Sequence, residues 1–211
     1  MSASPQPSSP RRSAATTRAA ILEAAKARFV RESYDNVGIR DIAADVGVDP
    51  ALVHRYVGSK AELFAEVLSC SGDAREIWSG DRATFGARAA RALIDEPQNS
   101  GKLEAVLIML RSAGSPKAQE IIRRSVGDRF HRPVAECIGG PDADVRAALI
   151  GSVMMGAAIQ RSIKGARWLA EPGERALYRR LLADLLQDLF DGGRRDGTAA
   201  TKPAAPEPAT T

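Results

Sequence analysis

The sequence contains few of the residue types from which catalytic and metal sites are usually built. It has only two cysteines, Cys70 and Cys137, and two histidines, His54 and His131. The cysteines lie far apart without a Cys-x-x-Cys spacing, so we expect reduced thiols and no zinc site or disulfide framework. No His-Glu-x-x-His, P-loop or Gly-x-Gly-x-x-Gly pattern occurs. We therefore expect no catalytic residue, metal or cofactor, and a helical enzyme remains only a remote alternative.

Aromatic residues, strand patterns and long apolar runs are also scarce. Aromatic residues make up 5% of the chain, whereas hydrophobic residues make up 44% and alanine is abundant, which favours helices over strands. No run approaches the roughly 18 apolar residues that span a bilayer, and the N-terminal stretch lacks the apolar segment of a signal peptide. These features predict an all-α cytoplasmic protein without a membrane partner, and the net charge of +4 is compatible with a nucleic-acid partner.

Serine, proline and alanine dominate both ends of the chain, which predicts a disordered N-terminal arm over 1–14 and a disordered tail over 192–211. Between them, apolar residues at helical spacing predict about nine helices. The expected helices span 16–32, 39–46, 50–56, a segment beginning after Ser59, 81–95, 103–112, 116–137, 142–167 and 173–190.

The stretch from Ile39 to Lys60 has the pattern of a helix-turn-helix over about residues 38–57. Gly47 sits at the corner, where a positive φ is easiest for a residue without Cβ. Asp49 can cap the second helix, and Pro50 suits its first turn. A plain helical hairpin is the alternative. It explains the apolar positions but not the outward polar side chains of Arg40, His54, Arg55 and Lys60.

Residues 16–68 closely resemble the DNA-binding domain of TetR-family transcriptional regulators. They contain "TRAAILEAA", "IRDIA", "GV" and "GSKAELF", and "LRSAGSPKAQEIIRR" resembles more weakly a regulatory domain of the family. The resemblance implies a DNA-binding domain over 15–75 and a ligand-binding and dimerisation domain over 76–191. It also implies a homodimeric repressor that binds a palindromic operator on double-stranded DNA and is released by a small-molecule effector. An effector-independent regulator or an activator is the alternative.

Carried over residue by residue, the resemblance implies a set of DNA contacts. His54 lies where the family usually has tyrosine, and Tyr56 lies where it often has histidine. Ser33 replaces a usual glycine, and Val37 replaces a usual threonine. The flexible stretch expected before the first helix contains the basic residues Arg11, Arg12 and Arg18. It is either an arm exposed to solvent or an arm that follows DNA. The implied DNA-binding residues are Arg40, Ala51, Leu52, His54, Arg55, Tyr56 and Lys60.

The remaining helices supply the other two expected surfaces. Small residues in 142–167 and leucines in 173–190 form either an internal core or, as in the family, the dimer interface: Gly151, Met154, Met155, Gly156, Leu181 and Leu185. Arg111 ends an apolar helix and either caps it or meets an acidic ligand. Methionine and aromatic residues at helical spacing more often belong to a core than to a binding site. The candidate effector-binding residues are Trp78, Phe85, Leu107, Met109, Leu110, Arg111 and Ile122.

Overall fold

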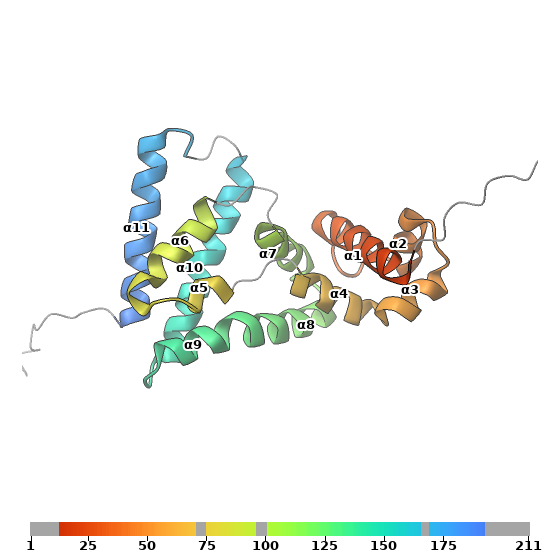
Figure 1. The fold of residues 1–211 in the computed structure, drawn as a ribbon, viewed down its shortest axis with the longest axis horizontal. Helices are drawn as coiled ribbons and strands as arrows, with labels where there is room; N and C mark the ends of the chain where they lie inside the picture. Colours follow the sequence, from red (N-terminus) through yellow and green to blue (C-terminus); the bar gives the residue numbers. More distant parts are fainter. Residues whose placement is uncertain (1–12, 71–74, 96–100, 166–168, 193–211) are drawn as a thin grey trace, which may run out of the picture.

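A computed structural model describes residues 13–70, 75–95, 101–165 and 169–192, and all regular elements within them are helical. Two bundles lie at opposite ends of an elongated molecule (Figure 1). The all-α prediction is therefore confirmed. The helices are α1 (Ala14–Arg31), α2 (Ile39–Val46), α3 (Pro50–Val57), α4 (Lys60–Cys70), α5 (Arg75–Trp78), α6 (Phe85–Ile94), α7 (Gly101–Ser112), α8 (Pro116–Val126), α9 (Arg132–Ile138), α10 (Ala143–Lys164) and α11 (Pro172–Asp191).

The N-terminal bundle is built on the buried stripe of α1. Phe29 from this stripe meets Tyr34 and Phe64, and the Phe29–Phe64 and Tyr34–Phe64 ring centroids are both 4.9 Å apart in edge-to-face geometry. Ile42 and Val53, from α2 and α3, are fully buried against the same cluster. Burial of these apolar side chains fixes the short helices α2 and α3, which are too short to be stable alone.

The C-terminal bundle has its own core between α6, α10 and α11. Phe85 stacks on Phe190 with ring centroids 4.1 Å apart. Gly86 lets α6 approach α11 closely, because a Cβ at this position would lie 2.1 Å from the Ala183 carbonyl oxygen. The Gly86 N–H donates to Oε1 of Gln187 at 2.8 Å. This crossing is the tightest helix contact that the glycine geometry reveals in the described residues.

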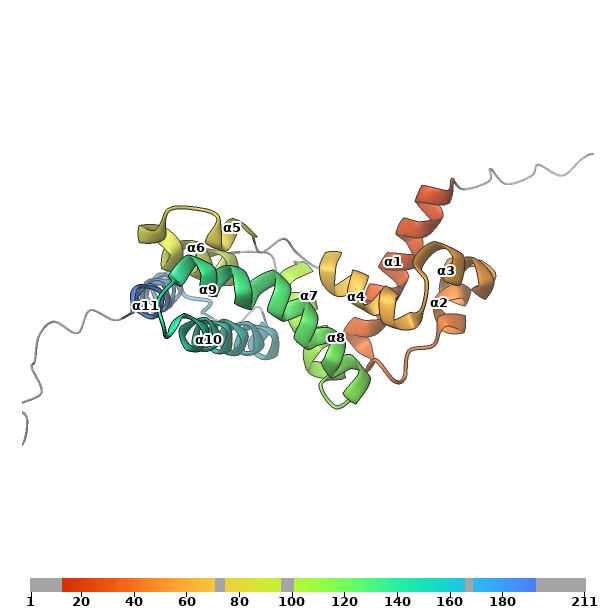
Figure 2. The ribbon, with the colours of Figure 1, turned by 90° about the horizontal axis from the view of Figure 1, so that it is seen from below.

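The corner between α7 and α8 belongs to the N-terminal core although it is remote in sequence. Ile108 and Ala118 are fully buried in the same cluster as Phe29. The Tyr34 N–H donates to Oγ of buried Ser112 at 3.0 Å, and Oγ of Ser115 donates to Asp35 at 2.9 Å. From this corner α8 runs toward α9 and the C-terminal bundle in both views (Figure 1, Figure 2). The α7–α8 corner is thus joined to the N-terminal bundle by polar as well as apolar contacts.

Several expected boundaries are corrected by the structure. The helix expected over 116–137 contains a π-helical turn, Gly127–His131, and the one expected over 81–95 begins with a 3-10 turn, Arg82–Thr84. The short helix α5 was not expected. At the ends, Ser13 caps α1 by accepting the Thr16 N–H at 3.2 Å, and Gly192 ends α11. These terminal residues are ordered because they complete helix caps, whereas 1–12 and 193–211, with Arg11 and Arg12, lie outside the described residues.

Arg18 does not belong to a flexible arm. It lies within α1, where its Nε donates to the Tyr56 carbonyl oxygen at 3.3 Å and its guanidinium forms an ion pair with Glu66. Position 18 already fell within the helix expected over 16–32, so its assignment to the flexible stretch was wrong. None of the helices within the described ranges has the length and apolar character needed to cross a membrane.

Candidate nucleic-acid interface

The turn between α2 and α3 has the geometry of a helix-turn-helix. Gly47 adopts a left-handed conformation with φ +73°, and the Val48 N–H donates to the Ala43 carbonyl at 3.0 Å. Oδ1 of Asp49 accepts the Ala51 N–H at 2.7 Å, and Pro50 is the first residue of α3. The predicted corner, cap and first turn are therefore confirmed.

One face of α3 points outward. Ala51, His54 and Arg55 are exposed, and Leu52 and Tyr56 are half-buried. Nδ1 of His54 lies 3.1 Å from the Gly58 carbonyl oxygen, which ties this side chain to the end of its own helix. Arg40, in the first turn of α2, is exposed as well. Neither Arg40 nor Arg55 has a hydrogen-bond or ion-pair partner among the described residues, so both guanidinium groups can meet a ligand.

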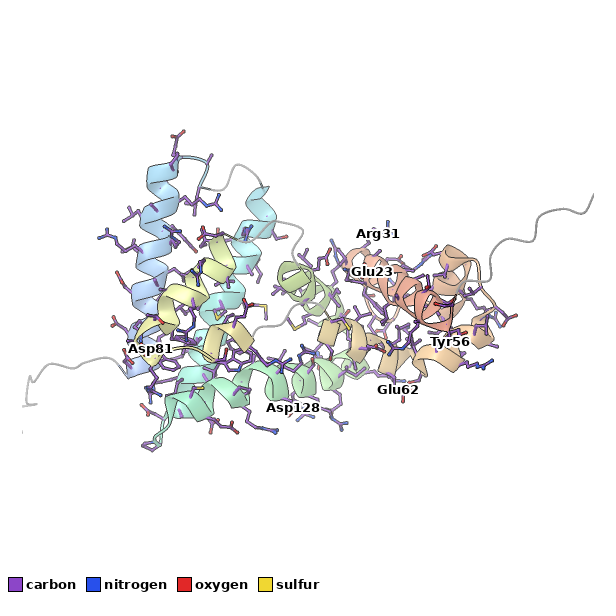
Figure 3. All side chains as sticks on the ribbon, in the orientation of Figure 1. Glu23, Arg31, Tyr56, Glu62, Asp81 and Asp128 are labelled. Carbon is purple, nitrogen blue, oxygen red and sulfur yellow. The ribbon has the colours of Figure 1, made fainter. Side chains whose placement is uncertain are left out.

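The helix that follows α3 is fixed by a reciprocal cap. The Ser59 N–H donates to Oε2 of Glu62 at 2.7 Å, and the Glu62 N–H donates to Oγ of Ser59 at 3.2 Å. These hydrogen bonds from Ser59 lower the pKa of the Glu62 carboxyl. The two hydrogen bonds form a capping box at the start of α4, the helix that the sequence predicts after Ser59. Figure 3 shows Glu62 and Tyr56 at this edge of the N-terminal bundle.

Besides the contact of Arg18 with α3, a second side-chain contact joins α1 to the end of α2. Nε and Nη2 of Arg28 donate to the two carboxylate oxygens of Asp45 at 2.5 and 2.8 Å. This bidentate hydrogen bonding from Arg28 lowers the pKa of Asp45. The helix-turn-helix is therefore held from both sides, by Arg18 at α3 and by Arg28 at α2.

Lys60 is engaged within the chain. Its Nζ lies 4.5 Å from the centroid of the Tyr34 ring and donates to the Asp35 carbonyl oxygen at 3.4 Å. Burial and the nearby charge of Lys117 lower the pKa of Lys60, although Asp35 opposes them. A phosphate contact by Lys60 stays a prediction, and it would have to compete with these contacts.

A cavity of about 420 Å³ lies between the two bundles. Two of the candidate effector residues, Trp78 and Met109, line it, and an effector site there stays a prediction. Its walls come from α4, α5, α7, α8, the π-helical turn and the start of α9. The lining residues are Leu68, Arg75, Trp78, Ala105, Met109, Ser125, Val126, Asp128, Arg129, Phe130 and Pro133.

The other expected effector residues lie elsewhere. Phe85 is fully buried in the C-terminal core, where it stacks on Phe190. Ile122 packs against the N-terminal core, Leu107 is half-buried outside the cavity lining, and Leu110 and Arg111 are exposed.

The sequence pattern missed Arg129 and Phe130, because it predicted one regular helix over 116–137, whereas the π-helical turn Gly127–His131 rotates the side chains from their regular positions. The only signals for a distortion were the flanking Gly127 and Pro133.

The outer faces of α10 and α11 carry apolar side chains that nothing covers within the described chain. Leu181 is 56% exposed and Leu185 is 47% exposed, and their role in a dimer stays a prediction. The face also includes Val145, Leu149, Ile163 and Leu177.

The other expected dimer residues divide between this face and the interior. Gly156 is exposed, with no atom within 4 Å of a Cβ built on it, and Met155 is half-buried. Gly151 faces inward, since a Cβ there would lie 3.3 Å from Phe130, and Met154 packs against the C-terminal core.

Comparison with known protein families gives matches to both bundles. Residues 21–67 match the family described as bacterial regulatory proteins, tetR family. Residues 83–189, half of the chain, match the tetracyclin repressor-like C-terminal domain. The chain belongs to the TetR family. The matched family is one of bacterial regulatory proteins, and the surface of α2 and α3 is the candidate DNA interface.

Individual relatives agree with this assignment. An uncharacterised helix-turn-helix regulator of Mycobacterium tuberculosis is 32% identical over 142 residues, which are 64% of each chain. The TetR-family chain thus spans about 64% of the length of the curated relatives that it matches first. A helix-turn-helix transcriptional repressor of Streptomyces coelicolor is 44% identical over 52 residues, which are 25% of this chain and 27% of that one.

A solved structure shows the same fold. NalD, the secondary repressor of the MexAB-OprM multidrug efflux pump in Pseudomonas aeruginosa, superposes with a TM-score of 0.60. The sequences are 20% identical, and the match covers 88% of this chain and all of the other.

Proposed function

We propose that this TetR-family regulator is a repressor that binds a two-fold operator as a homodimer and leaves it when a small molecule binds. The observation that carries the proposal is the outward face of α3, where Arg55 is exposed and has no partner among the described residues. An arginine on a recognition helix can donate two hydrogen bonds to O6 and N7 of guanine. Ala51, beside it on the exposed face, can make an apolar contact to a thymine methyl group.

The outer face of α10 and α11 supports the homodimer. A single helix-turn-helix contacts few base pairs, so tight and selective binding requires two copies on half-sites about 34–36 Å apart. The exposed leucines of α11 and the open surface at Gly156 on α10 offer an apolar face for a second copy of the chain. Burial of that face would stabilise the dimer.

The position of α8 supports release by an effector. Val126, at its C-terminal end, lines the cavity, and the helix begins beside Ser115, which donates a hydrogen bond to Asp35 of the N-terminal bundle. One helix therefore connects the cavity to the DNA-binding bundle. A ligand that prefers a different position of α8 would change operator affinity by that difference in free energy, typically about 1–3 kcal/mol or 5–150-fold.

The test begins with selection of bound sequences from a random DNA pool, followed by affinity measurements on the selected site. We expect a palindromic site, and we expect Arg55→Ala to weaken binding to it by about 1–3 kcal/mol. The matched control is Arg31→Ala, which removes an exposed arginine from the end of α1. Equal affinity for selected and random DNA, or equal losses in the two variants, would contradict the proposal.

A further inference from the structure

We propose that the effector is an amphiphilic anion, an acid with an apolar or aromatic body, and that Arg129 binds its charged group. The proposal rests on the proposed function, because it assigns a chemical class to the molecule that occupies the cavity. It also relocates the basic group: Arg111, the arginine that the sequence offered for an acidic ligand, is exposed and does not line the cavity.

The first step concerns the charges on the cavity wall. Asp128 is already neutralised, because its Oδ1 accepts a hydrogen bond from Nη2 of Arg132 at 2.6 Å. Arg75 is engaged in an interaction within the chain. Arg129 is half-buried and has no hydrogen-bond or ion-pair partner among the described residues. Arg129 therefore offers the cavity a half-buried guanidinium that no described residue engages, and pairing with an anion is stronger there than at a fully exposed site.

The second step concerns the backbone that carries Arg129. A π-helical turn adds one residue to a helix, so the side chains that follow it are rotated by about 100° from their regular α-helical positions. Here Asp128, Arg129 and Phe130 all line the cavity, and all three lie in the π-helical turn Gly127–His131. Figure 3 shows Asp128 on the stretch where α8 continues toward α9. π-helical turns are rare and occur frequently at functional sites. This turn therefore supports a functional role for the cavity wall.

The third step concerns the rest of the wall, which suits an apolar body. The rings of Trp78 and Phe130 meet edge to face with centroids 5.8 Å apart, and Leu68 and Met109 line the same space. The volume of about 420 Å³ lies in the usual range for small-molecule sites, roughly 300–1,000 Å³. An aromatic or alkyl group can fill this volume while its acid group reaches Arg129.

A cationic ligand is the main rival, since aromatic rings can hold a quaternary ammonium group. The charges of the cavity wall disfavour a cationic ligand. The one carboxylate of the wall is occupied by Arg132, and Arg129 would repel a second positive charge. Electrostatics thus favour the anion.

The experiment uses the full chain and a panel of probes in matched sets. Each set contains one aryl or alkyl carboxylate, its uncharged amide and a trimethylammonium analogue with the same apolar body. Calorimetry should show the carboxylate binding about tenfold or more tightly than its amide, as expected for a charge-assisted hydrogen bond. Arg129→Gln should remove that preference while leaving the amide affinity unchanged. Arg124→Gln, on the exposed face of α8 and outside the cavity lining, should retain it.

Three results would overturn the assignment: amides or cations that bind as well as the carboxylates, a preference that survives Arg129→Gln, or a panel in which no member binds. Operator affinity is measured in the same titrations. Carboxylates that bind through Arg129 without releasing DNA would refute effector release and leave the anion site standing. Release of DNA by the neutral or cationic probes would support effector release and refute the anion site.

Discussion

At the scale of single residues, Gly47 shows how one backbone conformation sets the angle between α2 and α3. Its φ of +73° is costly for any residue with a Cβ, although no atom lies within 4 Å of a Cβ built there. Gly47→Ala should therefore destabilise the fold by backbone strain alone, about 1–2 kcal/mol. Urea denaturation monitored by circular dichroism measures the free energy of unfolding. Gly114→Ala is the control, because its surroundings are equally open and its φ is not positive; an equal loss there would contradict the strain argument.

Asp45 provides a pH-dependent contribution at the same scale. Hydrogen bonds from Arg28 hold the pKa of Asp45 below its usual value of 3.8. A carboxyl whose pKa is lower in the folded state stabilises the fold above the unfolded-state pKa, and this stabilisation disappears as pH falls through the folded-state pKa. Asp45→Asn should therefore reduce the free energy of unfolding at neutral pH. The difference from the wild type should begin to shrink below about pH 4 and should vanish only when pH has fallen below the lowered folded-state pKa of Asp45. A difference that stays constant across denaturation curves from neutral to acid pH would rule out the ion pair as its cause.

At the scale of helices, the crossing of α6 and α11 depends on the absence of one methyl group. A Cβ at position 86 would lie 2.1 Å from a backbone oxygen and 2.8 Å from the Gln187 backbone nitrogen. Neither can move without shifting α11. Gly86→Ala should therefore cost about 1–3 kcal/mol or more through overpacking, measured by chemical denaturation. Gly173→Ala places the same methyl group in open space on α11, so we expect little change there. Wild-type stability in Gly86→Ala would show that the helices can separate freely.

Prediction from the sequence succeeded for helices whose determinants are local. The corner at Gly47, the cap at Asp49 and the box between Ser59 and Glu62 each depend on residues a few positions apart, so the chain shows them directly. The apolar stripe of α1 was visible for the same reason. The site at Arg129 was not visible, because a π-helical turn shifts every later side chain by about 100° and depends on packing between distant helices. The contacts of Ser112 and Ser115 with Tyr34 and Asp35 were missed because the residues lie far apart in the sequence.

At the scale of the whole molecule, the outer face of α10 and α11 leads to a prediction about assembly. Leu181 is 56% exposed, so Leu181→Glu should leave the protomer folded and destabilise the dimer by placing a charge in an apolar interface. Sedimentation at micromolar concentration should show monomers, and operator affinity should fall by at least about tenfold. Ala87→Glu adds the same charge at an exposed position of α6 and should leave both properties unchanged. A wild-type protein that is already monomeric would contradict the premise.

The participation of the α7–α8 corner in the N-terminal core limits how modular this chain is. Ile108 and Ala118 fill space beside Phe29 and Phe64, and Ser112 satisfies the backbone N–H of Tyr34. An engineer who exchanged residues 15–75 for the DNA-binding domain of another regulator would leave the new domain facing side chains fitted to the old one. A working chimera would have to carry this corner along, so the exchangeable unit is two separate pieces of sequence. The same constraint applies to evolutionary change. Recombination at a single crossover would replace the DNA-binding domain but break the shared core. Substitutions on the exposed face of α3 would leave that core intact.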